Sequence, residues 1–234
     1  MFVYADNAAT TCVSKTALDA MMPYLTEQYG NPSSLYAFAQ NSKEALENAR
    51  KTVADIIGAQ PKEIYFTSGG SEADNQAIIS AAKLGAKKGK KHIISTKFEH
   101  HAVLHTLKKL EKEGWEVTLL DVHEDGVVRV DELRDAIRED TCLVTVMFAN
   151  NEIGTVQPIT EIGAICRERG VPFHTDAVQA AGHMPIDVKA MNIDMLSMSG
   201  HKFHSPKGVG VLYVKRNIPL LSLIEGGTQE RGKR

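Results

Sequence analysis

Patterns typical of helices and of strands alternate along this chain from about residue 40 onward, and this alternation restricts its fold more than any other feature. Apolar residues recur every three or four positions in the helical segments, and short runs rich in Val, Ile, Leu and Phe separate these segments. The run 142–148 is almost entirely apolar, as expected of a strand buried on both faces of a parallel sheet. We therefore expect an α/β fold with a mainly parallel sheet and helices on both faces.

The expected elements follow one another without a long linker, an internal repeat or a low-complexity tract. Helices are expected at about 45–57, 71–82, 102–113, 131–138 and 159–169. Strands are expected at about 63–67, 92–95, 115–122, 142–148, 171–174, 195–198 and 208–214. One domain is therefore predicted to cover nearly the whole chain.

Size and charge exclude several classes of protein. The 234 residues are 43% hydrophobic, which is enough to bury a substantial core. The formal net charge of −2 gives no indication of nucleic-acid binding, and the lysines between 83 and 91 are interpreted as the solvated end of a helix. No apolar run of about 18 residues is present, and residues 1–6 lack the pattern of a signal peptide. We expect a cytoplasmic protein that binds neither nucleic acid nor membranes.

The three cysteines are Cys12, Cys142 and Cys166. Their number is odd, they are widely spaced, and they form neither a CxxC pair nor a cluster with histidines, so we expect no disulfide and no metal site. Cys142 opens the apolar run and Cys166 lies in a helical pattern. Both are therefore expected to have structural roles in the core or on a helix face.

Polar clusters follow several of the predicted strands. The segments 67–72, 99–101, 150–154, 176–179 and 199–202 all lie at such junctions. In an open α/β sheet the carboxyl ends of the strands meet at one edge, where the following helices present free N–H groups to ligands. We expect these five segments to converge on one site.

The chemistry of that site is indicated by Lys202 and Asp176. Lys202 follows a short apolar run and has hydroxyl and imidazole neighbours, which suits an amine that holds an aldehyde cofactor as a Schiff base beside its phosphate. Asp176 ends an apolar strand, where a carboxylate needs a partner such as a pyridinium nitrogen. The glycines before Ser71 allow close backbone approach to an anion, and Ser71 is expected to cap its helix while donating to phosphate. Together these residues predict a pyridoxal 5′-phosphate (PLP) site.

The same residues also allow simpler interpretations. His100 could stack on a planar ring and move protons, or it could be a solvent-facing loop histidine. Asn151 could donate to the phenolate oxygen of PLP. Asp176 could cap the helix expected to follow it, and the glycine-rich turn before Ser71 could serve only to begin a helix. These alternatives stay open on the residues alone.

Several motifs occur in an order that resembles one known family. They are residues 4–11, 30–34, 66–72, 99–100, 150–154, 176–179 and 199–202. With these motifs the chain resembles the cysteine desulfurases of the NifS/IscS type, within the class V aminotransferase-like PLP enzymes of fold type I. The resemblance implies the large domain of that fold.

The resemblance also implies a role for each matching residue. Lys202 would hold PLP covalently, His100 would stack on its ring, and Asp176 would pair with the ring nitrogen. Gln179 would bond the phenolic oxygen, and Asn151 would contact cofactor and substrate. The phosphate would be held by Gly70, Ser71, Ser199 and His201. The implied catalytic residues are Lys202 and His100.

The implied reaction removes sulfur from L-cysteine, giving L-alanine and a persulfide on an enzyme cysteine. The sulfur would then pass to an acceptor, either an iron–sulfur scaffold, a tRNA-thiolation protein or another carrier, for assembly of iron–sulfur clusters or thio-cofactors. The resemblance further implies a homodimer.

The chain departs from the family in its length. We expect residues 1–234 to be the PLP-binding large domain, with an N-terminal segment at about 1–20 and the start of a truncated C-terminal region at about 215–234. The sulfur-accepting cysteine, an arginine for the substrate carboxylate and one phosphate contact from the dimer partner would lie in the part that is missing. This chain alone is therefore expected to be inactive.

Three positions differ from the family in residue type. Tyr36 stands where a histidine is common. Cys12 stands where proline is common and does not match the sulfur-accepting cysteine. Ser205 stands where glycine is usual, and a positive φ there would cost about 1 kcal/mol.

Two other functions remain as alternatives: another class V PLP enzyme, such as a selenocysteine lyase or an aminotransferase, and a non-catalytic dimerisation scaffold. The joint presence of Lys202, His100, Asp176 and Gln179 argues against a decayed site.

Overall fold

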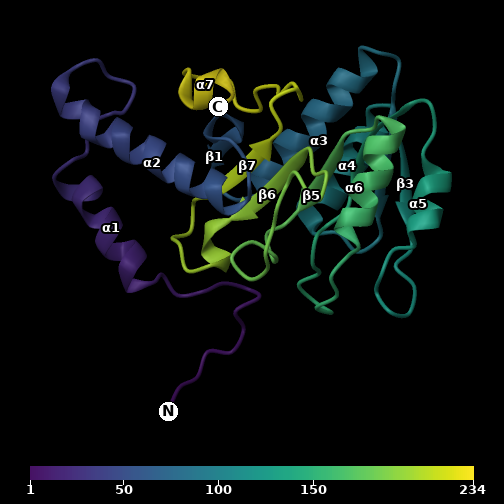
Figure 1. Cartoon of the computed structure of the whole chain (residues 1–234), viewed down its shortest axis with the longest axis horizontal. Coiled ribbons are helices and arrows are strands. Elements are labelled where there is room, and N and C mark those ends of the chain that lie inside the picture. The colour runs from purple at the N-terminus through teal and green to yellow at the C-terminus, as the bar shows by residue number, and fades with distance from the viewer.

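The computed structural model describes residues 1–234, and its centre is one seven-stranded sheet (Figure 1). The strands are β1 (Ile64–Thr67), β2 (His92–Thr96), β3 (Glu116–Leu120), β4 (Thr141–Thr145), β5 (Phe173–Asp176), β6 (Met195–Ser199) and β7 (Gly210–Val214). Their order across the sheet is β1-β7-β6-β5-β4-β2-β3. β7 is antiparallel to both of its neighbours, and all other pairs are parallel, which confirms the expected mainly parallel sheet.

Helices cover both faces of the sheet. The α-helices are α1 (Lys15–Thr26), α2 (Gln40–Ile56), α3 (Gly70–Ala86), α4 (His101–Lys112), α5 (Val130–Ala136), α6 (Ile159–Arg169) and α7 (Gln229–Gly232). Short 3-10 helices are η1 (Ala37–Ala39), η2 (Pro61–Glu63) and η3 (Gly200–Lys202). α1 lies at the left of the view near α2, and the N-terminal residues extend away from the sheet (Figure 1). No helix is long and apolar enough to cross a membrane.

Two hydrophobic cores lie on opposite faces of the sheet because successive strand residues point to opposite sides. Ile93 belongs to a core of 14 buried residues with α3 and α4. The next residue, Ile94, belongs to a core of 27 buried residues with α2, α5 and α6. Cys142 and Cys166 are buried, one in each core, as expected from their patterns. Burial raises the pKa of Cys142 to about 11 and that of Cys166 to about 12.

The helix signals in the sequence locate several boundaries. α6 spans Ile159–Arg169 as expected, and Gly170 ends it with a φ of 65°. α2 ends at Ile56, two residues before Gly58, whose φ is 70°. These left-handed conformations favour glycine, which explains why the helices end there.

The structure differs from the sequence expectation in two places. The predicted strand 142–148 is regular only to Thr145. Val146 N and Phe148 N still donate to carbonyl oxygens of β5, whereas Met147 N donates to the Glu99 carboxyl at 2.9 Å and to no strand. α1 was not expected. It has no buried residue, so it lacks the core-facing apolar pattern that predicts a helix, although the Ser14 side chain caps it by accepting a hydrogen bond from Ala17 N at 3.1 Å.

Candidate active site

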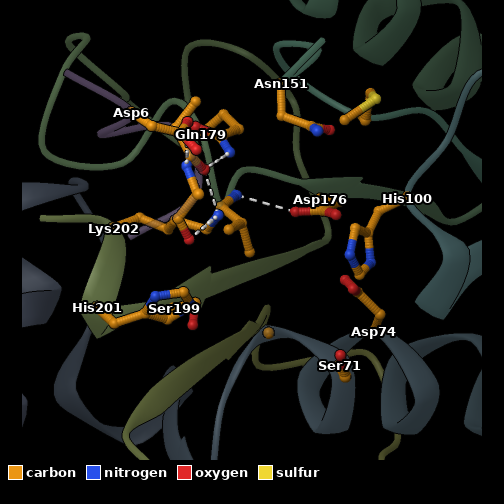
Figure 2. Close-up of a pocket in the computed structure, with 15 residues that line it drawn as sticks. Asp6, Ser71, Asp74, His100, Asn151, Asp176, Gln179, Ser199, His201 and Lys202 are labelled. Carbon is orange, nitrogen blue, oxygen red and sulfur yellow. Dashed lines mark hydrogen bonds between the residues drawn. The ribbon is translucent and has the colours of Figure 1, made fainter. Parts of the chain in front are cut away.

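The five polar segments converge on a cavity of about 540 Å³ at the carboxyl edge of the parallel strands. Figure 2 shows His100, Asp74 and Asp176 on one side of this cavity and Lys202, Gln179 and Asp6 opposite them. All nine residues assigned to the site from the sequence line it: Gly70, Ser71, His100, Asn151, Asp176, Gln179, Ser199, His201 and Lys202. The structure brings these residues together, and their individual roles remain predictions.

Lys202 ends η3, directly after β6, and its side chain reaches the N-terminal segment. Its Nζ atom donates hydrogen bonds to the carbonyl oxygens of Ala8 and Ala9, the latter at 3.0 Å. Burial lowers the pKa of Lys202, while the charges of Asp176 and Asp6 oppose this shift. A half-buried amine with a lowered pKa is more often neutral, and the neutral amine is the form that attacks a carbonyl carbon.

Asp176 ends β5 and is 3% exposed. Its Oδ1 atom accepts a hydrogen bond from Val178 N at 2.9 Å, so the carboxylate does cap the turn that follows. The same side chain lines the cavity, and Oδ2 makes no hydrogen bond within the chain. The two interpretations of Asp176 are therefore compatible: one oxygen caps the turn and the other is free for a ligand.

The N-terminus of α3 forms a corner of the cavity whose donors suit an anion. The first N–H groups of this 17-residue helix have no partner within the helix, and the hydroxyls of Ser71 and Ser199 line the same space. Packing is tight here, since a Cβ atom added to Gly70 would lie 2.6 Å from Val178 Cγ2. The expectation that Ser71 caps α3 was wrong: Gly69 occupies the cap position and Ser71 lies in the first turn, where its hydroxyl is left free.

His201 and His100 occupy different parts of the site. His201 Nδ1 lies 3.0 Å from Thr10 Oγ1, and burial together with Lys202 and Lys207 lowers the pKa of His201. His100 is exposed and is the N-cap residue of α4, where its Nδ1 accepts a hydrogen bond from Ala102 N at 3.1 Å. This bond leaves Nε2 as the position that can carry or release a proton.

Gln179 and Asn151 also line the cavity. Gln179 Nε2 donates at 2.9 Å to the carbonyl oxygen of Ala8, which also accepts a hydrogen bond from Lys202. Asn151 is exposed in the loop after β4. Residues 8 and 9 of the N-terminal segment thus occupy one wall of the cavity through their backbone carbonyls.

Sequence reasoning missed Asp74 and gave no role to Glu99, two buried acids of which only Asp74 lines the cavity. Asp74 lies on α3 within an otherwise apolar helix face and is 1% exposed. Glu99 is 5% exposed and accepts hydrogen bonds from Thr96 Oγ1 at 2.6 Å and Met147 N at 2.9 Å. Burial raises the pKa of Glu99 to about 8. An acidic residue between apolar helix positions was the signal that could have revealed Asp74.

Two of the unusual residue types noted in the sequence lie beside the site. Ser205 has no positive φ, so the strain that a positive φ would cause does not arise there. The left-handed residue is its neighbour His204, with φ of 65°. Ser205 packs on Gly200, where an added Cβ would lie 2.9 Å from Ser205 Cβ. Cys12 is exposed and does not line the cavity.

The groups that line the cavity fit PLP. Free N–H groups and hydroxyls at the start of α3 suit a phosphate, the Lys202 amine suits an aldehyde, and the buried Asp176 carboxylate suits a protonated ring nitrogen. The buried Asp74 Oδ1 atom also lacks a partner within the chain. Polar atoms of Asp74, His100 and Asp176 lie within 4.8 Å of one another. These three residues line the same cavity as the Lys202 amine and the start of α3.

This fold and site define a class, which comparison with known proteins identifies. The chain belongs to the aminotransferase class-V family, whose model matches residues 3–230. Within this family it is similar to the cysteine desulfurases of the IscS and NifS type. It is 57% identical over 232 residues to "Cysteine desulfurase IscS" of Clostridium botulinum and 57% identical to the protein of that name from Methanosarcina thermophila.

Solved structures agree with these relatives. A "NIFS-like protein" superposes with a TM-score of 0.96 at 41% identity, and "SspA in complex with cysteine" with a TM-score of 0.94 at 44% identity. Each match covers 99% of this chain, with 64% of the first structure and 67% of the second. The chain spans 58% of the length of the Clostridium botulinum relative and 57% of the Methanosarcina one.

Proposed function

We propose that residues 1–234 form the PLP-binding large domain of a cysteine desulfurase, with about 1–20 as its N-terminal segment and about 215–234 as the start of a C-terminal region. The observation that carries this proposal is the placement of the Lys202 amine and the Asp176 carboxylate in one cavity that also holds the free N-terminus of α3. The names of the similar IscS proteins support the choice of reaction.

Each residue of the site has a task in this proposal. PLP, when bound, supplies an electron sink for negative charge at a substrate carbon. Lys202 attaches the cofactor and afterwards moves a proton with its freed amine. Asp176 keeps the ring nitrogen protonated, and Gln179 and Asn151 orient the ring through its oxygen. His100 covers one ring face and holds a proton at Nε2.

The phosphate of the cofactor would be held at the start of α3. Backbone N–H groups at Gly70 and Ser71 and the hydroxyls of Ser71 and Ser199 are free to donate to it. His201, which also lines this corner, adds a further donor. This arrangement fixes the position of the ring relative to Lys202 without any charged side chain from α3.

The proposed substrate is L-cysteine, and the proposed product is L-alanine. The similar structure of "SspA in complex with cysteine" supports this choice. The proposal also includes a homodimer and an acceptor protein for the sulfur. The N-terminal residues expose large apolar side chains such as Phe2 and Leu35, which supports contact with a further protein surface.

The three cysteines of this chain are poor sulfur acceptors. Cys142 and Cys166 are buried with raised pKa values, so neither presents a thiolate at neutral pH. Cys12 does not line the cavity. We therefore propose that sulfur transfer uses a cysteine outside residues 1–234, and that this chain alone releases no more sulfide from L-cysteine than free PLP does. Sulfide and alanine assays with Cys12→Ser as a companion test this point, and turnover that Cys12→Ser abolishes would refute it.

The binding proposal is tested by titrating the chain with PLP and recording its absorbance. Lys202→Ala should abolish the covalent adduct, whereas Lys207→Ala, at an exposed lysine nearby, should retain it. Asp176→Ala should weaken PLP binding by about ten-fold or more, as expected for loss of a buried charge-assisted hydrogen bond. Equal binding by Asp176→Ala and the unmodified chain would assign Asp176 to turn capping alone.

A further inference from the structure

Asp74 is a buried acid in the cavity to which the proposed function gives no task. It lies on α3, is 1% exposed, and points toward the His100 ring in Figure 2. Its Oδ1 atom makes no hydrogen bond with the rest of the chain. An ionised carboxylate in this position would lose its hydration without gaining donors, which is costly.

The nearest candidate for a cationic partner is His174 on β5, whose Nε2 lies 3.7 Å from Asp74 Oδ1. This distance exceeds that of a hydrogen bond. His174 instead has Nδ1 at 2.8 Å from Thr145 Oγ1 and Nε2 at 3.0 Å from Ser197 Oγ. Burial lowers the pKa of His174 to about 3, so the imidazole is neutral at pH 7. His174 therefore does not balance a charge on Asp74.

The other titratable groups around Asp74 are two acids and two groups of the cavity wall. Glu99 is a buried acid whose own pKa is raised to about 8. Asp176, His100 and Asp74 have polar atoms within 4.8 Å of one another, and Lys202 lies across the cavity. Two buried carboxyls at this separation do not both ionise, because each negative charge raises the pKa of the other.

The surroundings decide which of the two carboxyls carries the charge. Burial raises the pKa of Asp176, but the hydrogen bond that its Oδ1 atom accepts from Val178 N at 2.9 Å and the positive charge of Lys202 oppose this shift. For Asp74, burial and the charge of Asp176 raise the pKa well above the usual value, and Ser197 opposes this only in part. The negative charge therefore belongs to Asp176.

We propose that Asp74 is a positioning residue that stays protonated at neutral pH, so that the Asp74 and Asp176 pair carries one negative charge, on Asp176. The inference rests on the proposed function in one respect: that single charge is what would pair with the ring nitrogen of PLP. A neutral Asp74 cannot compete for the nitrogen, so the ring has one defined position. The proton on Asp74 is present before the cofactor enters and stays there afterwards.

Infrared spectroscopy of the chain with ¹³C-labelled aspartate tests this directly, without any substitution. A protonated aspartate absorbs as a carboxylic acid, and the label shifts that band while leaving the band of Glu99 in place. The chain at pH 7 without PLP should show one labelled carboxylic-acid band, and the PLP-loaded chain should retain it. Absence of any labelled acid band at pH 7 would overturn the proposal.

Substitutions then assign the band. Asp74→Asn should remove it, whereas Asp176→Asn and the exposed control Asp121→Asn should retain it. A band that is lost in Asp176→Asn and retained in Asp74→Asn would place the proton on the wrong carboxyl and refute the assignment. If Asp74→Asn does not fold, the labelled spectra of the unmodified chain and of Asp176→Asn still decide the question.

A second measurement separates this charge state from a purely structural role. A proton kept by Asp74 in the folded chain is released on unfolding, so the folding equilibrium constant falls by up to ten-fold per pH unit above the ordinary carboxyl pKa. Asp74→Asn should reduce this pH dependence, and an unchanged dependence would count against the proposal. Failure of the unmodified chain to bind PLP would refute the proposed function while leaving the infrared result intact.

Discussion

Lys202 Nζ donates a hydrogen bond to the carbonyl oxygen of Ala9 at 3.0 Å, which ties the amine of the site to a segment 193 residues earlier in the chain. The carbonyl of Ala8 accepts from both Lys202 and Gln179. The N-terminal segment therefore forms a wall of the cavity, and it helps to bury the amine. This burial has a measurable consequence for the pH dependence of the site.

The first prediction is that PLP attaches to the chain faster as pH rises, with a midpoint below 10.5, the ordinary lysine pKa. The reason is that burial lowers the pKa of Lys202, so the reactive neutral amine forms at lower pH. Asp176→Asn should lower the midpoint further, because the charge of Asp176 raises the pKa of Lys202. Stopped-flow absorbance at several pH values measures this. A midpoint at or above 10.5 would contradict the burial of the amine.

Glu99 gives the second prediction, which concerns stability. Its pKa is about 8 in the folded chain and about 4.3 when unfolded, so the folded state retains a proton that the unfolded state loses. Its stabilising effect is therefore complete below pH about 4 and is lost as pH rises through about 8. Over that range the unfolding free energy falls by up to about 1.4 kcal/mol per pH unit.

Glu99→Gln should flatten this pH dependence, because the amide does not titrate. Urea unfolding at pH 5, 7 and 9 measures the effect. Glu113→Gln provides a matched control, since Glu113 is an exposed residue and its substitution should leave the pH dependence as it is. Parallel curves for Glu99→Gln and the unmodified chain would show that Glu99 is ionised in the folded state.

The third prediction concerns the close approach at the start of α3. Gly70→Ala should destabilise the fold by about 1 to 3 kcal/mol and weaken PLP binding, since the added Cβ would lie 2.6 Å from Val178 Cγ2. Val178→Ala removes that atom, so the double variant Gly70→Ala with Val178→Ala should recover part of the loss. A double-mutant cycle from urea unfolding measures the coupling. Strictly additive effects would mean that the two residues do not compete for space.

The fourth prediction concerns a buried ion pair at the edge of the sheet. Arg50 lies 2.7 Å from Glu230, and their side chains are 4% and 10% exposed. Arg50→Met should cost about 3 to 5 kcal/mol of unfolding free energy, because the buried Glu230 charge would lose its Arg50 partner and keep only the hydrogen bond from Phe66 N at 3.0 Å. The exposed pair of Lys15 and Asp19 is the control: Lys15→Met should change stability by less than about 1 kcal/mol. Similar losses for both variants would contradict this difference.

Much of the fold is predictable from the sequence because each core-facing element repeats its apolar residues with its own period. α6 matches its predicted range, and the ends of β1 and β6 differ from prediction by one residue. α1 is not predicted because none of its residues is buried, so its sequence lacks the apolar spacing of a helix that packs on a core. The end of β4 is not predicted because the apolar run continues past it, while the N–H of Met147 donates to the Glu99 carboxyl and not to a neighbouring strand.

The residues of the candidate site also fall into a group that the sequence predicts and a group that it does not. The nine predicted residues lie at strand ends or helix starts, which a parallel sheet brings to one edge. Asp74 lies inside a helix, and it reaches the site because α3 packs across β5 and β6, more than 95 residues later in the chain. That packing depends on the whole sheet. An acid among apolar helix positions marks Asp74 as unusual, but the sequence alone does not predict that it reaches this site.

The central claim is that Lys202 is the residue that holds PLP covalently. The most direct measurement loads the chain with PLP, reduces it with borohydride, digests it and locates the pyridoxyl group by mass spectrometry. The account predicts the modification on Lys202, in the peptide that contains Ser199 and His201, and its absence in Lys202→Ala. A pyridoxyl group on Lys207, or spread over the lysines at 83–91, would contradict the account.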